Sequence, residues 1–405
     1  MADNKDKKVL NVPALRFPEF SGEWKKLRLS DFATKITKKN KGNIVKNVLC
    51  NSANLGLVPQ GNYFDREIAN TENTDGYYVI CNGDFVYNPR KSTAAPFGPV
   101  NIYEGEDAGI ISPLYLCFSV HNIFPKFLYY RFKSSAWHSY VYSHGDSGVR
   151  FDRVSIKDDV FFDMPIYKPA QDEQIKIATL LQLIDDRIST QNKIIEKYES
   201  LIQAIIYKAK MDGISKGTWR RIDLCKVLQE RNEKNVDGRT ICSVSVSQGV
   251  VNQIEYLGRS FAAKQTSHYN VVKYGDIVYT KSPTGDFPYG IIKRSDIRED
   301  VAVSPLYGVY IPASDSIGVI LHFYFMRPSN TFNYLHPLIQ KGAKNTINIT
   351  NGRFLKNSVP LPISKSEANT IAGILKTIQA KIEIEKNLLL SYTNEKEYLL
   401  RQMFI

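Results

Sequence analysis

Two segments of the chain carry apolar residues at alternating spacings of four and three, which places them along one stripe of an α-helix. The first runs from about Gln171 to Lys210 and contains no glycine or proline. Its stripe is Ile177, Leu181, Ile184, Ile188, Gln191, Ile195, Tyr198, Ile202, Ile205 and Ala209. The series returns 194 residues later as Ile371, Leu375, Ile378, Ile382, Glu385, Leu389, Tyr392, Lys396, Leu399 and Met403. We therefore predict two matching helices, each roughly 50 Å long.

The two stripes share a tyrosine position, Tyr198 and Tyr392, and a polar interruption, Gln191 and Glu385. A seven-residue repeat sustained over several heptads is typical of a coiled coil, in which a few polar seam residues fix the register. For either segment alone, a helix packed only on its own domain remains an alternative. The match between the segments favours their pairing as an antiparallel coiled coil, with one globular domain at each end.

The rest of the sequence is also written twice. Gly22 to Leu27, which contains Trp24, returns as Gly217 to Ile222 with Trp219, an offset of 195. Ser112-Pro113-Leu114-Tyr115 returns unchanged as Ser304-Pro305-Leu306-Tyr307, an offset of 192, and Met164-Pro165-Ile166 as Leu361-Pro362-Ile363, an offset of 197. A repeat of this length indicates two similar domains rather than a short-period solenoid.

Each copy begins with short runs rich in Tyr, Phe, Val and Ile, broken by turn signals such as Asn82-Gly83-Asp84. This composition predicts an α+β fold: two similar strand-rich domains joined by two long helices in an antiparallel coiled coil. The glycines of the segment 210–217 are expected to stop the first helix and lead into the second domain. The predicted boundaries are an N-terminal tail at 1–21, domains at 22–168 and 213–363, and helical regions at 169–212 and 364–405.

The chain is basic, with 53 Lys and Arg against 41 Asp and Glu in 405 residues and a net charge of +12. An excess of this size favours a polyanionic partner such as nucleic acid, although lysines that are merely solvated give the same composition. The polar amino terminus is not a secretory signal, and no apolar run reaches about 18 residues, so we expect a cytoplasmic protein with a disordered N-terminal end. The five cysteines are scattered, which favours reduced structural thiols over disulfides or zinc.

The motifs that accompany common catalytic chemistry are absent. The sequence contains no phosphate-binding G-x-x-x-x-G-K-[ST], no G-x-S-x-G and no H-E-x-x-H, and its six histidines are dispersed. Glu19, Glu23 and Lys25 resemble pieces of a metal-dependent nuclease site. Their spacing is too tight for such a site, and Thr218 stands at the matching position of the second copy. We therefore expect no catalytic residues and no metal ligands in this chain.

Basic and polar side chains gather in turn-rich stretches of both domains. Arg and Lys can reach guanine edges, Asn can bracket adenine, and Ser and Thr position phosphates. The two copies differ in these loops, as Pro89-Arg90-Lys91 against Lys281-Ser282-Pro283 shows, so two copies of one scaffold would recognise two different sequences. For each residue a solvated loop remains the alternative. The candidate DNA-binding residues are Lys35, Lys38, Lys39, Tyr87, Asn88, Arg90, Lys91, Ser92, Thr93, Arg150, Arg153, Lys264, Lys281, Ser282, Thr284, Lys344 and Asn345.

Over essentially all its length the chain resembles the specificity subunit of type I restriction-modification systems. The resemblance rests on the opening residues 13–20 followed by Trp24, on the strings 84–87 and 276–279, on both Ser-Pro-Leu-Tyr strings, and on Pro165-Ile166 leading through Glu173-Gln174 into residues 184–188. The second copy departs from the pattern where residues 365–369 replace Gln171 to Gln174.

The resemblance implies that each half pairs a target-recognition domain with a helical region and reads one part of a bipartite, asymmetric site in double-stranded DNA. It also implies a subunit that is not catalytic by itself. Two modification subunits would supply S-adenosylmethionine-dependent adenine methylation, and restriction subunits would hydrolyse ATP and cut DNA, so S-adenosylmethionine, ATP and Mg²⁺ belong to the partners. The main rival is a coiled-coil adaptor whose globular ends bind proteins; an autonomous nuclease or methyltransferase is a third interpretation.

Overall fold

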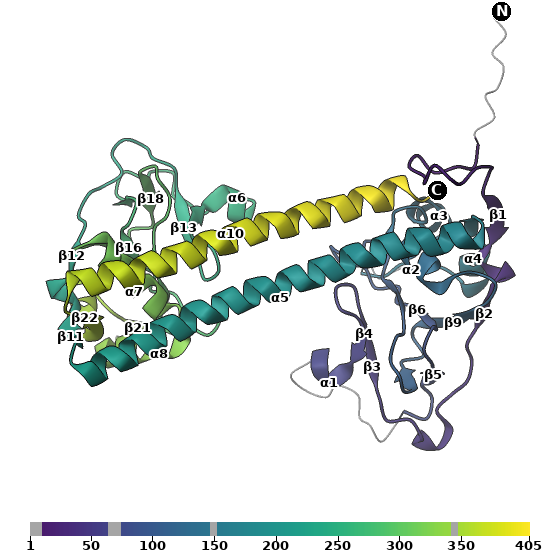
Figure 1. Ribbon diagram of the computed structural model, residues 1–405, viewed down its shortest axis with the longest axis horizontal. Coiled ribbons are helices and arrows are strands. Elements are labelled where there is room, and N and C mark those ends of the chain that lie inside the picture. Colours follow the sequence, from purple (N-terminus) through teal and green to yellow (C-terminus); the bar gives the residue numbers. More distant parts are fainter. Residues whose placement is uncertain (1–9, 64–73, 146–151, 342–346) are drawn as a thin grey trace, which may run out of the picture. The chain divides into compact units, whose positions relative to one another are not determined.

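The computed structural model describes residues 10–63, 74–145, 152–341 and 347–405. By their contacts they form two compact units, one containing Met1–Thr190 and Leu388–Ile405 and the other Gln191–Asn387. We call these unit 1 and unit 2. The two long helices, α5 (Gln171–Lys216) and α10 (Lys365–Gln402), each contribute one part to each unit (Figure 1).

Unit 1 is built around a four-stranded antiparallel sheet in the order β2-β9-β6-β7. Its strands are β2 (Ala33–Lys35), β9 (Leu116–Val120), β6 (Phe85–Tyr87) and β7 (Val100–Ile102). Three antiparallel pairs accompany it: β1 (Lys25–Arg28) with β10 (Pro165–Lys168), β3 (Leu49–Ser52) with β4 (Gly56–Pro59), and β5 (Tyr78–Ile80) with β8 (Gly109–Ile111). The short helices are η1 (Leu29–Asp31), η2 (Lys41–Asn43), α1 (Gln60–Tyr63), α2 (Pro125–Lys133), α3 (His138–His144) and α4 (Asp158–Phe162).

Unit 2 repeats the four-stranded sheet and the three strand pairs of this plan and has one further pair among the described residues. Its four-stranded sheet has the order β12-β19-β16-β17, formed by β12 (Leu228–Glu230), β19 (Gly308–Pro312), β16 (Ile277–Tyr279) and β17 (Ile292–Arg294). The matching pairs are β11 (Trp219–Asp223) with β22 (Ser358–Pro362), β13 (Cys242–Ser245) with β14 (Gly249–Asn252), and β15 (Asn270–Val272) with β18 (Val301–Val303). The remaining elements are η3 (Leu224–Lys226), α6 (Gln253–Leu257), α7 (Asp315–Phe325), α8 (Pro328–Leu335), η4 (His336–Leu338), α9 (Asn351–Phe354) and the pair β20 (Gln340–Lys341) with β21 (Ile347–Asn348). The predicted α+β class and the duplication are confirmed.

The heptad stripes supply the contacts of the long helices. In unit 1, Ile177, Leu181 and Ile184 of α5 share a buried cluster with Leu399 and Met403 of α10. The chain continues into the same cluster, where the ring of Phe404 lies 5.4 Å from that of Phe127. In both predicted stripes, every position is buried or half-buried.

In unit 2 the later part of α5 meets the earlier part of α10. Gln191 hydrogen-bonds Glu385, and the ammonium of Lys386 lies 3.8 Å from the Glu199 carboxylate. Because the start of α5 meets the end of α10 in unit 1 and the reverse holds in unit 2, the helices pack in antiparallel orientation. Among the described residues, no helix is long and apolar enough to cross a membrane.

Each long helix begins at the same docking contact. The indole Nε1 of Trp24 donates to the Glu173 carboxylate at 3.2 Å, and that of Trp219 donates to Glu367 at 2.8 Å. Glu367 therefore takes the part of Glu173 although the residues around it differ. The entry into the second helix therefore shares this tryptophan–glutamate contact with the first.

The end of α5 lies beyond the predicted boundary at residue 212. The helix passes through Gly213 and stops at Gly217, whose φ of +72° suits glycine. The Thr218 N–H closes the turn on the Gly213 carbonyl at 2.9 Å. Gly213 has a packing role, because a Cβ there would lie 1.9 Å from the Trp219 indole.

One further expectation is corrected. Pro165 and Pro362 are not equivalent, since Pro165 pairs with Arg28 whereas Pro362 pairs with Trp219; Ile166 is fully buried and Ile363 is 48% exposed. Residues 10–21 of the predicted N-terminal tail contact the rest of unit 1, and residues 1–9 lie outside the described residues. The guanidinium of Arg16 there makes two hydrogen bonds to the carboxylate of Glu173, at 2.7 and 2.8 Å.

Candidate nucleic-acid interface

The β6–β7 and β16–β17 connections are two copies of one loop, which we call loop 1 (residues 88–99) and loop 2 (residues 280–291). Both close with a backbone bridge, Ser92 with Ala95 in loop 1 and Thr284 with Phe287 in loop 2. Both end in a glycine of positive φ, Gly98 at +83° and Gly290 at +96°. A Cβ at either glycine would lie about 2 Å from a backbone oxygen of its own loop, at 2.1 and 1.9 Å. The two loops therefore share their bridge and their close-packed glycine, and they differ at the turn between the bridged residues, where Gly285 has a φ of +50° and Thr93 has no positive φ.

A tyrosine at the base of each loop fixes this backbone. The Tyr87 hydroxyl donates to the carbonyl of Phe97 at 3.0 Å, and that of Tyr279 donates to Tyr289 at 2.9 Å. The Tyr87 ring stacks on Phe161, and the Tyr279 ring stacks on Phe354. Burial raises the pKa of both phenols. Tyr87 is only 2% exposed, so we assign it to the core and not to a DNA contact.

The side chains on the two loops differ. Arg90 is exposed and Lys91 half-buried in loop 1, where loop 2 carries Ser282 and Pro283, both exposed. Loop 2 has its cation one position earlier, at Lys281. Loops 1 and 2 thus present different hydrogen-bond donors at corresponding positions, as the sequence comparison predicted.

A second segment adds to the basic surface of loop 1. The Lys91 N–H donates to the carbonyl of Asp152 at 2.8 Å, and the Val154 N–H donates to that of Pro89 at 2.9 Å. This pairing places Arg153 opposite Arg90, whose guanidinium lies 3.8 Å from the Asp152 carboxylate. Among the described residues, the buried Nε of Arg153 has no hydrogen-bond partner. Arg90, Lys91 and Arg153 are therefore brought together.

The other unit 1 candidates lie at separate points or have local roles. Lys35 ends β2 and forms a 2.5 Å ion pair with Asp158, a hydrogen bond that raises the pKa of its ammonium. Lys38 and Lys39 are exposed in the segment after β2, and neither has an ion-pair partner within the described ranges. The Asn88 side chain accepts the Arg90 N–H at 3.0 Å and so shapes the loop. Ser92 and Thr93 are exposed at the tip of loop 1.

In unit 2, burial lowers the pKa of Lys281, which is half-buried at the base of loop 2. Ser282 and Thr284 are exposed, and the Thr284 hydroxyl donates to the Ser282 carbonyl at 3.3 Å. Lys264 is exposed in the connection between α6 and β15 and does not belong to loop 2. The candidates Arg150, Lys344 and Asn345 lie outside the described residues.

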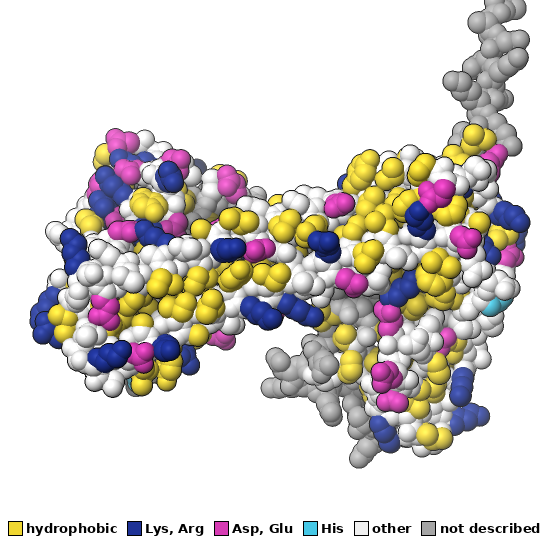
Figure 2. Space-filling model, viewed as in Figure 1, with side chains coloured by type: hydrophobic (Ala, Val, Ile, Leu, Met, Phe, Trp, Pro, Cys, Tyr) yellow, Lys and Arg dark blue, Asp and Glu magenta, His cyan; other side chains and the backbone are white. Residues whose placement is uncertain are grey.

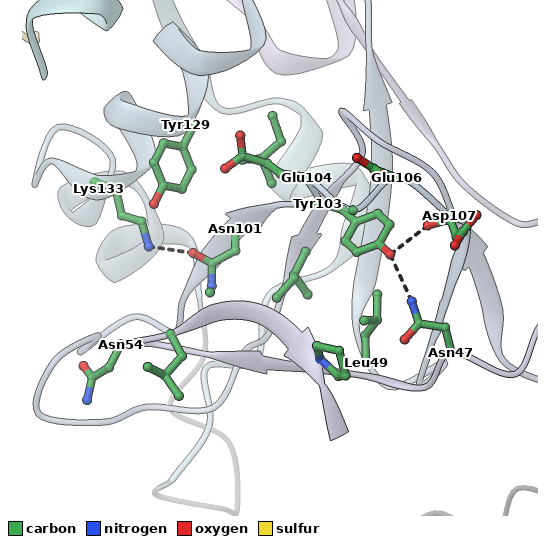
Figure 3. A pocket seen from close by; sticks show the side chains of 16 residues that line it. Asn47, Leu49, Asn54, Asn101, Tyr103, Glu104, Glu106, Asp107, Tyr129 and Lys133 are labelled. Carbon is green, nitrogen blue, oxygen red and sulfur yellow. Dashed lines mark hydrogen bonds between the residues drawn. The ribbon is translucent and has the colours of Figure 1, made fainter. Parts of the chain in front are cut away.

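A pocket in unit 1 is unsuited to DNA. Figure 3 shows Glu104, Glu106 and Asp107 along one side, with Lys133 opposite them. The Lys133 ammonium donates to Asn101 at 2.6 Å, and burial lowers its pKa to about 8. Lys126 forms an ion pair with Glu104 at 2.6 Å, and the carboxylates of Glu106 and Asp107 nearby still disfavour a phosphate backbone. Within the described residues, no cluster of His, Cys, Asp and Glu suits a metal ion, and the nuclease-like Glu19 forms an ion pair with Lys176.

The long helices carry apolar side chains outside their stripes. Figure 2 shows hydrophobic side chains interspersed with charged ones over the visible face of α5 and α10. Side chains at least 38% exposed include Ile175, Leu183, Leu201, Ile384 and Leu390. Exposed apolar side chains on a helix surface can contribute to contacts with another protein.

No family model matches the chain, and no curated protein matches it in sequence. The fold does have solved counterparts. The chain is similar to a type I restriction-modification system S subunit from M. genitalium, at 13% identity and a TM-score of 0.60, covering 97% of this chain and 99% of that one. It is also similar to a chain from a structure of complex assembly and conformational transition in the type I R-M system, at 12% identity and a TM-score of 0.52, covering 94% and 97%. The chain therefore has the fold of type I restriction-modification S subunits.

Sequence reasoning missed the part of Asp152 and the exposure of Leu114. Asp152 lies between basic residues, and its carboxylate and carbonyl both hold loop 1. The candidates from that stretch are its cations alone, Arg150 and Arg153. An acidic residue inside a basic run is a signal for a local ion pair and could have identified Asp152. In the sequence Leu114 is a landmark of the duplication, and the sequence alone does not predict that its side chain is exposed.

Proposed function

We propose that this protein is the DNA sequence-specificity subunit of a type I restriction-modification complex. Each domain reads one half of a bipartite, asymmetric site in double-stranded DNA. The observation that carries the proposal is that loops 1 and 2 share a backbone bridge and a close-packed glycine and present different side chains. The fold likeness to type I S subunits supports the same conclusion.

Loop 1 and the segment beside it supply the chemistry for one half-site. A guanidinium such as that of Arg90 can make two hydrogen bonds to the major-groove edge of guanine, and lysines such as Lys38 and Lys39 can neutralise phosphates. Loop 2 offers Lys281 and the hydroxyls of Ser282 and Thr284 to the other half-site. Because the two loops carry different hydrogen-bond donors, they favour different bases, and the two halves of the DNA site differ in sequence.

The helix pair fixes the spacing of the half-sites. In this proposal α5 and α10 form a coiled coil whose length sets a constant gap between the two sequences. The first domain keeps the boundaries proposed from the sequence, 22–168, and the second begins at 217 instead of 213 and ends at 363, because the first helix extends to Lys216.

Partner subunits carry out the chemistry, and this chain does not catalyse it. Two modification subunits bind the chain and methylate adenine with S-adenosylmethionine, and restriction subunits use ATP and Mg²⁺. The exposed apolar side chains of α5 and α10 suit the docking of such partners. The assembly works in the cytoplasm, where its DNA is.

The test is to sequence methylated adenines at single-molecule level in DNA from cells with this chain and its modification subunit, and from cells lacking only the chain. We expect a bipartite motif with a constant gap that disappears without the chain. An active modification subunit with no chain-dependent motif would favour the protein-binding adaptor.

A further inference from the structure

The Ser-Pro-Leu-Tyr strings form the same turn in both units. The turn joins β8 to β9 at residues 112–115 and β18 to β19 at residues 304–307. In the first, the Tyr115 N–H donates to the Ser112 carbonyl at 3.1 Å, and the Ser112 hydroxyl accepts the Leu114 N–H at 3.3 Å. In the second, the corresponding distances are 3.0 and 3.3 Å. Sequence and geometry are both repeated.

The turn itself accounts for three of the four residues. The serine caps the turn, proline suits its second position, and the tyrosine packs beside the buried core, Tyr115 in unit 1 and Tyr307 in unit 2. The leucine has no such role. Leu114 is 66% exposed and Leu306 is 69% exposed, at a turn position that a polar residue would fill with better hydration.

Exposed leucine is not a general feature of the repeated turns. In the β3–β4 turn of unit 1, Leu55 is 61% exposed, and its counterpart in unit 2 is Gln248. Loops 1 and 2 diverge as well. An exposed side chain kept the same in both units, while other exposed loops differ, suits an object that both units meet in the same way.

In unit 1 the turn lies beside the candidate DNA-reading surface. Pro113, Leu114 and Tyr115 line one depression together with Pro89 of loop 1 and Val154. A protein that acts on a base next to the sequence read by loop 1 must approach this part of the unit. Leucine offers no donor to phosphates, and the two half-sites differ in sequence, so an apolar protein surface fits the repeated leucine better than DNA does.

We propose that Leu114 and Leu306 are equivalent docking contacts for two copies of the modification subunit, one on each domain. This inference rests on the proposed function. Each leucine contacts the same apolar surface of its copy and places that subunit beside the loop that reads DNA.

The experiment uses the full chain with Leu114→Ser, Leu306→Ser or both, and Leu55→Ser as the matched control. The binding of purified modification subunit is measured without DNA by calorimetric titration, and its stoichiometry by native mass spectrometry. We expect each single variant to weaken one of two binding events by about 10- to 100-fold, the double variant to weaken both, and Leu55→Ser to change neither. Equal thermal unfolding midpoints for all variants show that folding is intact.

Unchanged affinity in the double variant overturns the docking proposal. So does normal assembly combined with weaker DNA binding by the assembled complex, because the leucines would then contact DNA, as apolar wedges do between base pairs. Failure of the unsubstituted chain to bind any modification subunit would overturn the proposed function itself, which separates the two failures.

Discussion

Gln191 of α5 donates a hydrogen bond to the carboxylate of Glu385 in α10, and the two residues hold the same position in the two sequence repeats. The Gln191 amide also donates to the Glu385 carbonyl at 3.2 Å. Gln191 is 5% exposed, so this contact lies inside a mainly apolar seam. Polar pairs in such seams fix helix register.

Removing one partner of this pair is expected to destabilise the protein. Glu385→Leu leaves a buried amide without its carboxylate acceptor, and we expect the free energy of unfolding to fall by about 1 to 3 kcal/mol. The double variant Gln191→Leu/Glu385→Leu should recover most of the loss, because both polar groups are then gone. Urea unfolding measures both. Additive losses in the double variant would show that the two side chains are not coupled.

Two helical glycines should respond to alanine in opposite ways. A Cβ at Gly213 would meet the Trp219 indole, and we expect Gly213→Ala to destabilise by about 1 to 3 kcal/mol despite better helix propensity. Gly373 in α10 has nothing within 4 Å of such a Cβ, so Gly373→Ala should stabilise by about 0.5 to 1 kcal/mol. Thermal unfolding of both variants tests this. Stabilisation of similar size at both positions would contradict the packing role of Gly213.

DNA affinity is expected to fall steeply with salt. A slope of log K against log salt concentration of about −0.9 per neutralised phosphate follows from counterion release. Lys38→Ala/Lys39→Ala should make the slope less negative by up to about 1.8. Lys197→Ala, at an exposed position on α5, should not change it. Filter-binding titrations at several salt concentrations supply the slopes, and a slope near zero for the unsubstituted chain would favour the adaptor.

Stability should rise with pH above about 8 because of Lys293. Burial lowers the pKa of this amine to about 8, whereas its pKa in the unfolded chain is about 10.4. Between these values the unfolded state binds more protons, so the free energy of unfolding increases with pH, by up to about 1.4 kcal/mol per pH unit. Lys293→Met removes this contribution. Lys133, whose pKa burial also lowers to about 8, is present in both proteins and contributes equally to both curves. Urea unfolding from pH 7.5 to 9.5 should show a shallower rise in the variant, and parallel curves would contradict the assignment.

The helices and the duplication follow from local patterns, which is why the sequence predicts them. The stripes place Lys396 at a seam position, and its ammonium pairs there with Asp185. Short matching strings predict equivalent positions less reliably. Pro165 and Pro362 stand in similar strings but occupy different positions in their strand pairs. From the sequence Gly213 resembles a helix stop. In the structure the helix continues through Gly213, and the Trp219 ring packs against it.

The candidate interface is predicted only in part. Loops 1 and 2 can be found from their basic and polar composition. The burial of Tyr87 cannot be predicted in this way, because β6 is buried on both faces and its sequence shows no alternation of apolar and polar residues. The pairing of Lys91 with Asp152 joins segments about sixty residues apart and leaves no local signal in the sequence. The bases that Arg90 or Lys281 contact depend on side-chain placement against DNA.

The central claim is that each domain reads its own half of the site. The most direct test maps methylated adenines by single-molecule sequencing in cells carrying Arg90→Ala/Lys91→Ala, Lys281→Ala/Ser282→Ala or the unsubstituted chain. The account predicts that each variant relaxes the motif in one half-site, a different half for each, and leaves the other half and the gap unchanged. A change of both half-sites by either variant would contradict it.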